Sequence, residues 1–188
     1  KVATKPSEIN EKQIKSWLML SKSLNGRKQR ISAIKLFYSL TGHQPLKFRH
    51  IEYPKSEKRL PKVIDGDFLR SRIDRIDNLK HKAIIMLAYS VGLRVSEVVN
   101  LKLNDIDSAR MLITIRQAKG RKDRIVPLSE KVLETLRMYY KEYTPKEYLF
   151  NGQFDIRYSA TSCNQIVKQY LGKQYHFHLL RHSCFTSL

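Results

Sequence analysis

The chain has 188 residues, a length that suits one large domain or two small ones, and its 41% hydrophobic content excludes wholesale disorder. Its 36 lysines and arginines stand against 17 acidic residues, which gives a formal net charge of +19. An excess of this size predicts a polyanionic partner whose binding weakens as salt rises, although attachment to a ribosome or a membrane surface would involve the same balance.

Cysteine usage and apolar runs indicate where the protein works. The two cysteines, Cys163 and Cys184, have no metal-ligand spacing around them, so we expect a reducing cytoplasm rather than a disulfide scaffold. The longest strongly apolar run, residues 83–89, is too short to cross a bilayer, so no membrane partner is expected. Because the chain starts at Lys1 and ends inside an amphipathic pattern at Leu188, we also expect a piece of a longer protein.

The first third of the chain predicts two helices. Residues 7–24 form the first, with Ser7 as its N-cap, and Asn25-Gly26 ends it. Residues 27–40 form the second. The residues expected on its buried face are Ile31, Ile34, Leu36 and Phe37. The residues on its opposite face are Arg27, Lys28, Arg30 and Lys35. That basic face suits a DNA phosphate backbone, although an ordinary solvated face is equally expected for any one residue.

An aperiodic, proline-bearing stretch separates this region from the rest. Pro54–Pro61 has the composition of an extended linker. We therefore expect a helical domain over residues 1–54, a linker over 55–61 and a second domain over 62–188.

The second domain is expected to be mainly α with a small antiparallel β-sheet. Helices are predicted over residues 65–76, 79–91, 96–101, 129–143 and 159–171, with a last one around residue 178. Gly92 would end the second of these helices, and Ser96 would be the N-cap of the third. Residues 111–117 and 124–128 alternate like two strands of a hairpin with a basic tip.

One short motif in the last helix carries chemistry. His178, Arg181 and His182 are three and four residues apart, so a helix puts them on one face. A guanidinium between two imidazoles is costly unless an anion lies there, and a phosphate matches both groups. A solvated basic face is the alternative.

Two further cationic positions precede this motif. Arg94 stands at a helix start, where unpaired N–H groups favour an anion, and Glu97 could hold its side chain or cap the helix. Lys119 lies at the tip of the hairpin. Taken alone, the first is more often a structural helix start and the second a solvated turn lysine.

The order of these elements is more specific than any one of them. Residues 92–97 read GLRVSE, residues 118–124 read AKGRKDR and lead into VPL, and residues 178–182 read HLLRH. This resembles the tyrosine recombinase (phage integrase) family across the whole chain. The resemblance implies a partial helical core-binding domain over residues 1–54 and a tyrosine-recombinase catalytic domain from residue 62.

The resemblance also implies roles for the residues in these motifs. Arg94 and Arg181 would clamp the scissile phosphate, with His178 bonding the same group. Lys119, with a pKa lowered by the two guanidiniums, would protonate the departing 5′ oxygen of DNA. Glu97 and His182 would be support residues. Further DNA contacts are expected at Arg121 and Lys122 in the hairpin, and no metal or other cofactor is implied.

The chain departs from the family at the nucleophile. The family's tyrosine follows the HLLRH motif, and all ten tyrosines of this chain precede residue 178, so we expect a catalytic domain truncated before its nucleophile. Tyr175 is more naturally a packing residue, and Ser183 and Cys184 turn away from the face of Arg181.

The expected function is site-specific recombination of double-stranded DNA, as in an integrase or a resolvase. In the intact protein a 3′-phosphotyrosyl intermediate would form within a homotetramer on paired recombination sites, while this piece alone would be inactive. The alternatives are a non-catalytic DNA-binding module or regulator and a type IB topoisomerase-like enzyme. A metal-dependent nuclease is least expected, because no clustered carboxylates accompany the basic residues.

Overall fold

The computed structural model describes residues 5–41, 47–55, 63–116, 123–153 and 157–186. The chain divides into two compact units, Lys1–Leu60 (unit 1) and Pro61–Leu188 (unit 2). The expected division at residues 55–61 stays a prediction in its details, since part of that stretch lies outside the described residues.

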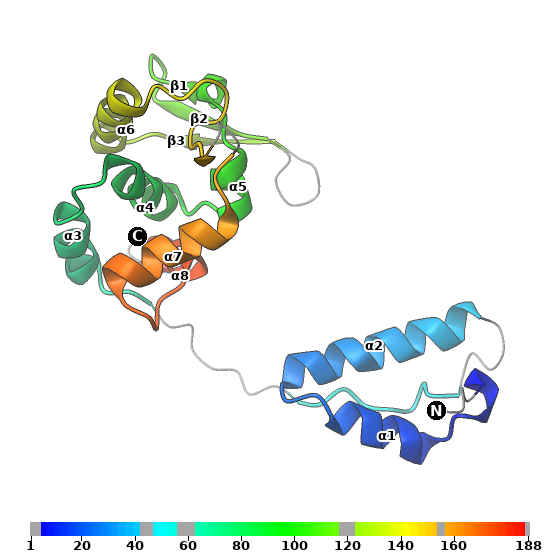
Figure 1. The fold of residues 1–188 in the computed structure, drawn as a ribbon. Helices are drawn as coiled ribbons and strands as arrows, with labels where there is room; N and C mark the ends of the chain where they lie inside the picture. The colour runs from blue at the N-terminus through cyan, green and yellow to red at the C-terminus, as the bar shows by residue number, and fades with distance from the viewer. Residues whose placement is uncertain (1–4, 42–46, 56–62, 117–122, 154–156, 187–188) are drawn as a thin grey trace. The chain divides into compact units, whose positions relative to one another are not determined.

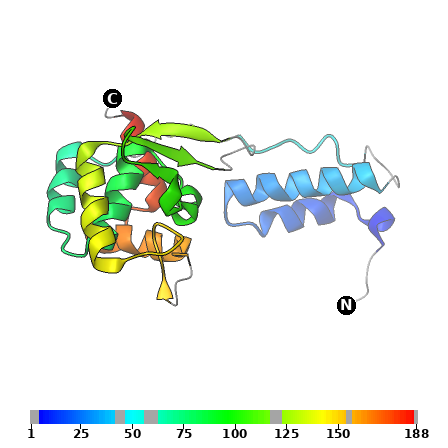
Figure 2. The same cartoon turned by 90° about the horizontal axis from the view of Figure 1, so that it is seen from above.

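Unit 1 contains a short 3-10 turn, Pro6–Glu8, and two helices, α1 (Glu11–Met19) and α2 (Leu24–Leu40), which lie side by side (Figures 1 and 2). Its small core consists of Ile14, Leu18, Ile31, Tyr38, Phe48 and Ile51. The core joins both helices to the segment after them, so the helices are held by tertiary contacts as well as by their caps.

The helix starts of unit 1 differ from those expected. Asn10, not Ser7, caps α1, because its side chain accepts from the backbone N–H of Gln13 while the Gln13 side chain accepts from that of Asn10. Asn25-Gly26 does not separate the two helices, although it was predicted to. The Ser23 hydroxyl accepts from the Gly26 N–H at 3.0 Å, so both residues lie inside the first turn of α2.

The buried face of α2 is also narrower than expected. Ile31 and Tyr38 are buried and Ile34 is half-buried, which follows the spacing of one helical stripe. Leu36 and Phe37 lie off that stripe and are 58% and 45% exposed. The prediction that these two residues are buried was therefore wrong.

Unit 2 is mainly helical with one small sheet, as the sequence predicts. Its helices are α3 (Gly66–Asp74), α4 (Leu79–Val91), α5 (Val95–Asn100), α6 (Glu130–Tyr143), α7 (Ala160–Leu171) and α8 (Phe177–Thr186), with a 3-10 turn at Leu103–Asp105. Helix α4 contacts α3, α5, α6, α7 and α8 (Figure 1). Its residues 83–88 are all buried, so the most apolar run of the chain is the centre of the unit.

The sheet is antiparallel and has the order β1-β2-β3, with β1 at Ile106–Asp107, β2 at Leu112–Ile115 and β3 at Arg124–Pro127. The expected hairpin strands are confirmed as β2 and β3, paired with Ile115 opposite Arg124. Strand β1 was not predicted, because two residues are too few to show alternation. The hairpin tip, residues 117–122, lies outside the described residues.

Two features position α5 and α8, the helices on which the candidate site lies. Gly92 ends α4 in the left-handed conformation (φ 62°), which lets the chain turn directly into α5. Ser183 on α8 is fully buried, and its hydroxyl donates to the Leu179 carbonyl and accepts from the Ile64 N–H at 2.8 Å each. The bond from Ile64 holds α8 against the start of unit 2, and both bonds turn Ser183 away from the Arg181 face, as expected.

Candidate active site

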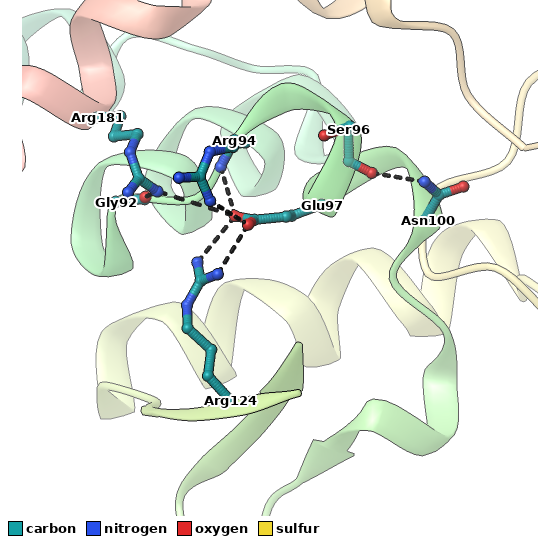
Figure 3. Close-up of polar contacts among 7 residues, drawn as sticks. All are labelled: Gly92, Arg94, Ser96, Glu97, Asn100, Arg124 and Arg181. Carbon is teal, nitrogen blue, oxygen red and sulfur yellow. Dashed lines mark hydrogen bonds and ion pairs between the residues drawn. The ribbon is translucent and has the colours of Figure 1, made fainter. Parts of the chain in front are cut away.

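Three guanidiniums from three separate elements converge on the carboxylate of Glu97, on α5 (Figure 3). Arg94 donates through its Nη1 to Oε1 at 2.8 Å. Arg124, the first residue of β3, donates from both Nη atoms to the two carboxylate oxygens, at 2.7 and 2.8 Å. Arg181, on α8, places its Nη1 at 3.9 Å from Oε2. This group of four residues is called the Glu97 cluster below.

The start of α5 explains how Arg94 is held. The helix begins at Val95 with Arg94 in the N-cap position, and the Arg94 backbone N–H donates to Oε2 of Glu97 at 2.7 Å. Ser96 is therefore not the N-cap. Glu97 is the third residue after this N-cap, and its carboxylate accepts from the N–H of the N-cap residue itself, as the glutamate of a capping box does, so it fixes both the backbone and the side chain of Arg94.

Glu97 is ionised throughout the ordinary pH range. Its side chain is only 5% exposed, and burial alone would raise its pKa. The hydrogen bonds from Arg124, from the Arg94 backbone and from the Arg94 side chain outweigh burial and lower the pKa of Glu97 to about 2. The cluster is thus a fixed negative charge among three positive ones.

Arg181 is fastened to the turn that ends α4. Its Nη1 donates to the carbonyl oxygen of Gly92, and its side chain is 19% exposed. Burial and the nearby Arg94 charge lower the pKa of the Arg181 guanidinium. A cation held beside another cation in a partly buried position favours an arriving anion.

The two histidines of the HLLRH motif lie together on α8. His178 is exposed, one turn before Arg181, and its ring meets that of His182 edge-on with centroids 4.4 Å apart. Partial loss of hydration beside the neighbouring side chains lowers the pKa of His178, and the nearby His182, Arg181 and Arg94 act in the same direction. His178 is therefore neutral at neutral pH and able to form a hydrogen bond without adding charge.

The structure brings together most of the predicted site. Arg94, Glu97 and Arg181 meet directly, and His178 lies next to them. Lys119, together with Arg121 and Lys122, lies outside the described residues, so its role stays a prediction. Arg124 was not among the predicted site residues. It is the last residue of the AKGRKDR motif and the first of the second hairpin strand, but no role was expected for it.

The basic face predicted on α2 makes contacts within unit 1. Arg30 donates to the Trp17 carbonyl at 2.6 Å and lies over the Trp17 ring. Arg27 donates to the Ser21 carbonyl, and Lys35 lies over the Tyr53 ring. Arg27, Lys28, Arg30 and Lys35 are all half-buried, and their contact with DNA stays a prediction.

Other predictions concern residues outside the cluster. Tyr175 packs against the core of unit 2 with its ring 6.0 Å from that of Phe68, as expected for a packing aromatic. Cys163 and Cys184 are free thiols. Within the described ranges, no helix is long and apolar enough to span a bilayer, and no three His, Cys, Asp or Glu side chains are grouped as metal ligands.

Known proteins resemble this chain in sequence and in fold. Residues 63–188 match the phage integrase family. The chain is 42% identical over 123 residues to the putative integrase/recombinase y4qK of Sinorhizobium fredii, covering 65% of this chain and 40% of that protein. It is 33% identical over 165 residues to the tyrosine recombinase XerA of Pyrococcus horikoshii, covering 84% of this chain and 58% of that protein. The chain thus spans about half the length of these relatives.

Solved structures agree with this assignment. A crystal structure of XerA recombinase aligns with a TM-score of 0.61 at 28% identity, covering 98% of this chain and 70% of that one. The XerH site-specific recombinase, bound to a palindromic difH substrate, has a similar fold with a TM-score of 0.78 at 21% identity, covering 96% of this chain and 59% of that one. These relatives are recombinases, which does not favour the topoisomerase or regulator alternatives. With its GLRVSE, AKGRKDR and HLLRH motifs in register, the chain belongs to the phage integrase family of tyrosine recombinases.

Proposed function

We propose that the protein is a site-specific DNA recombinase that binds duplex DNA and cleaves and rejoins its strands through a 3′-phosphotyrosyl intermediate. The observation that carries this proposal is the convergence of Arg94, Arg181 and His178, which are separated by up to 87 positions in the sequence, beside one buried carboxylate. A phosphodiester is the anion that suits two guanidiniums and a neutral imidazole.

The cluster would act mainly on the transition state. During strand cleavage the phosphorus becomes five-coordinate, and negative charge grows on its non-bridging oxygens. Arg94 and Arg181 would stabilise that charge from fixed positions, so little reorganisation is needed as the reaction proceeds. His178 would donate a hydrogen bond to the same group, and Lys119 would give a proton to the departing 5′ oxygen.

The nucleophile would be a tyrosine outside these 188 residues. Its phenolic oxygen would attack phosphorus as the bond to the 5′ oxygen breaks, which leaves a 3′-phosphotyrosyl ester and a free 5′-hydroxyl. The attack of that hydroxyl, or of the equivalent one on a second duplex, reverses the step and releases the tyrosine. Bond energy is retained in the ester, so no cofactor is needed.

The proposed partners and location rest on this chemistry, on the family resemblance and on the cysteine usage. We propose double-stranded DNA carrying specific recombination sites, a homotetramer on paired sites and a cytoplasmic location. The net charge of +19 supports DNA binding, because each neutralised phosphate releases counterions.

Duplex binding and adduct formation test the proposal in two steps. The 188-residue chain is expected to bind duplex DNA with a slope of log affinity against log salt of about −4 or steeper, as for four or more phosphates. The whole recombinase, given a duplex nicked beside the cleavage point, is expected to form an adduct that survives denaturation. A slope near zero together with no adduct would contradict the proposal, while a steep slope without an adduct would indicate a DNA-binding module.

A further inference from the structure

We propose that Arg124 is a positioning residue of this active site: it neutralises Glu97, so that Arg94 and Arg181 keep their charge for the DNA phosphate. This inference rests on the proposed function. Neither the sequence motifs nor the resemblance assigned Arg124 a role.

The geometry shows that Arg124 is the principal partner of the Glu97 carboxylate. It donates to both oxygens at 2.7 and 2.8 Å, which is the two-bond arrangement that fits a guanidinium to a carboxylate most closely. Arg94 gives one side-chain bond and one backbone bond to the same carboxylate, and Arg181 places its Nη1 at 3.9 Å from Oε2. Among the three guanidiniums, the one that makes both of its hydrogen bonds to Glu97 is therefore the one that is not expected to bind substrate.

The charges of the cluster explain why this matters. Three arginines and one glutamate leave a net charge of two positive, which equals the two negative charges on the equatorial oxygens of a five-coordinate phosphorus. Without Arg124, the same carboxylate would be neutralised by Arg94 and Arg181, and one net positive charge would remain. The donors would then point toward Glu97 in the absence of DNA and would have to reorient during the reaction.

Arg124 is held by the β-sheet, whereas the other residues of the Glu97 cluster lie on or next to helices. It is paired with Ile115 in the β2–β3 ladder, while Glu97 lies on α5 and Arg181 on α8. The cluster therefore depends on the sheet and two helices being packed correctly.

Two replacements and a matched control test the inference. Arg124→Gln removes the charge, and Arg124→Lys keeps it but loses the two-bond geometry. Arg116→Gln is the control, because Arg116 also donates to a buried carboxylate, that of Asp105 at 2.6 Å, but it is not part of the Glu97 cluster.

The first measurement is the titration of Glu97 in the 188-residue chain by ¹³C NMR. Arg124→Gln is expected to move the Glu97 midpoint upward from about 2, Arg124→Lys to move it less, and Arg116→Gln to leave it unchanged. An unmoved midpoint in Arg124→Gln would overturn the inference whether or not the protein is a recombinase, because this measurement needs no DNA.

The second measurement is the rate of adduct formation by the whole recombinase on a nicked duplex. Arg124→Gln is expected to lower the rate about 100-fold with duplex affinity within about threefold, and added methylguanidinium is expected to restore part of it. The control should stay within about threefold of wild type. A normal rate in Arg124→Gln, or a loss of affinity as large as the loss of rate, would overturn the positioning role. If wild type itself forms no adduct, the proposed function fails, and the Glu97 titration still decides whether Arg124 neutralises the carboxylate.

Discussion

Arg181→Ala in the whole recombinase is expected to lower the rate of strand cleavage by about 10³-fold or more. The guanidinium is anchored to the Gly92 carbonyl and lies in a partly buried position beside Arg94. A donor held in place before the reaction stabilises the transition state without reorganisation. Removing it is therefore expected to lower the rate constant of strand cleavage itself. The measurement is single-turnover adduct formation on a nicked duplex.

Duplex affinity is expected to change much less in the same variant. Binding is spread over many phosphates in a chain with 36 basic residues, and one contact contributes only a small share. Arg181→Lys, which keeps the charge but not the planar fork, should recover part of the rate. Arg70→Ala is the control, because Arg70 on α3 is 74% exposed and pairs only with the exposed Asp67 among the described residues. Cleavage by Arg181→Ala within tenfold of wild type would remove Arg181 from the mechanism.

Glu97→Gln is expected to destabilise unit 2 by about 3 kcal/mol at pH 7. The folded-state pKa of Glu97 is about 2, against a usual value of 4.5, and each unit of difference corresponds to about 1.4 kcal/mol. Because the pKa is depressed on folding, this stabilisation is fully present above pH 4.5. It is lost as the pH falls from about 4.5 to about 2.

Urea unfolding of the 188-residue chain checks both parts of this prediction. The amide signals of α4 and α8 report unit 2 by itself, and the stability of wild type should fall between pH 4.5 and 2 more steeply than that of Glu97→Gln. Glu134→Gln, on the exposed face of α6, should change stability by less than about 0.5 kcal/mol. A Glu97→Gln protein as stable as wild type at pH 7 would show that the ionised carboxylate does not hold the cluster together.

The sequence predicts the core of unit 2 well because its signals are local. The helix over residues 79–91 is confirmed at both ends, since an unbroken apolar run is followed by a glycine that can adopt positive φ. Asp65 caps α3, and Ser159 caps α7, where a short polar side chain precedes a periodic stretch. Such patterns need no knowledge of the rest of the chain.

Two helix starts were wrongly predicted because a different side chain from the expected one bonds the free backbone N–H at each start. Ser96 looked like an N-cap, but the Glu97 carboxylate is the group that accepts from the first free N–H. Asn25-Gly26 looked like a break, but Ser23 starts the next helix ahead of it. Both deciding hydrogen bonds join residues three apart, and polar side chains that stand close together in the sequence compete for such backbone groups.

The site could be predicted only as far as its motifs extend. Arg94, Glu97 and Arg181 were found because each belongs to a short motif, and the structure shows that they meet. The pairing of Arg124 with Glu97 spans 27 residues and joins a strand to a helix. No periodicity or spacing encodes such a contact, so it became visible only in the folded chain.

Replacing single phosphates of a bound duplex by neutral methylphosphonates tests most directly whether Arg94 and Arg181 hold one phosphodiester. On a duplex selected for tight binding to the 188-residue chain, one linkage is expected to lower wild-type affinity about tenfold when it is made neutral. In Arg94→Ala and in Arg181→Ala, a neutral methylphosphonate at that same linkage should no longer lower duplex affinity. Methylphosphonates at the other linkages should lower it as they do in wild type. If the two variants lose sensitivity at different linkages, or at none, the two arginines do not share a phosphate and the proposed active site is wrong.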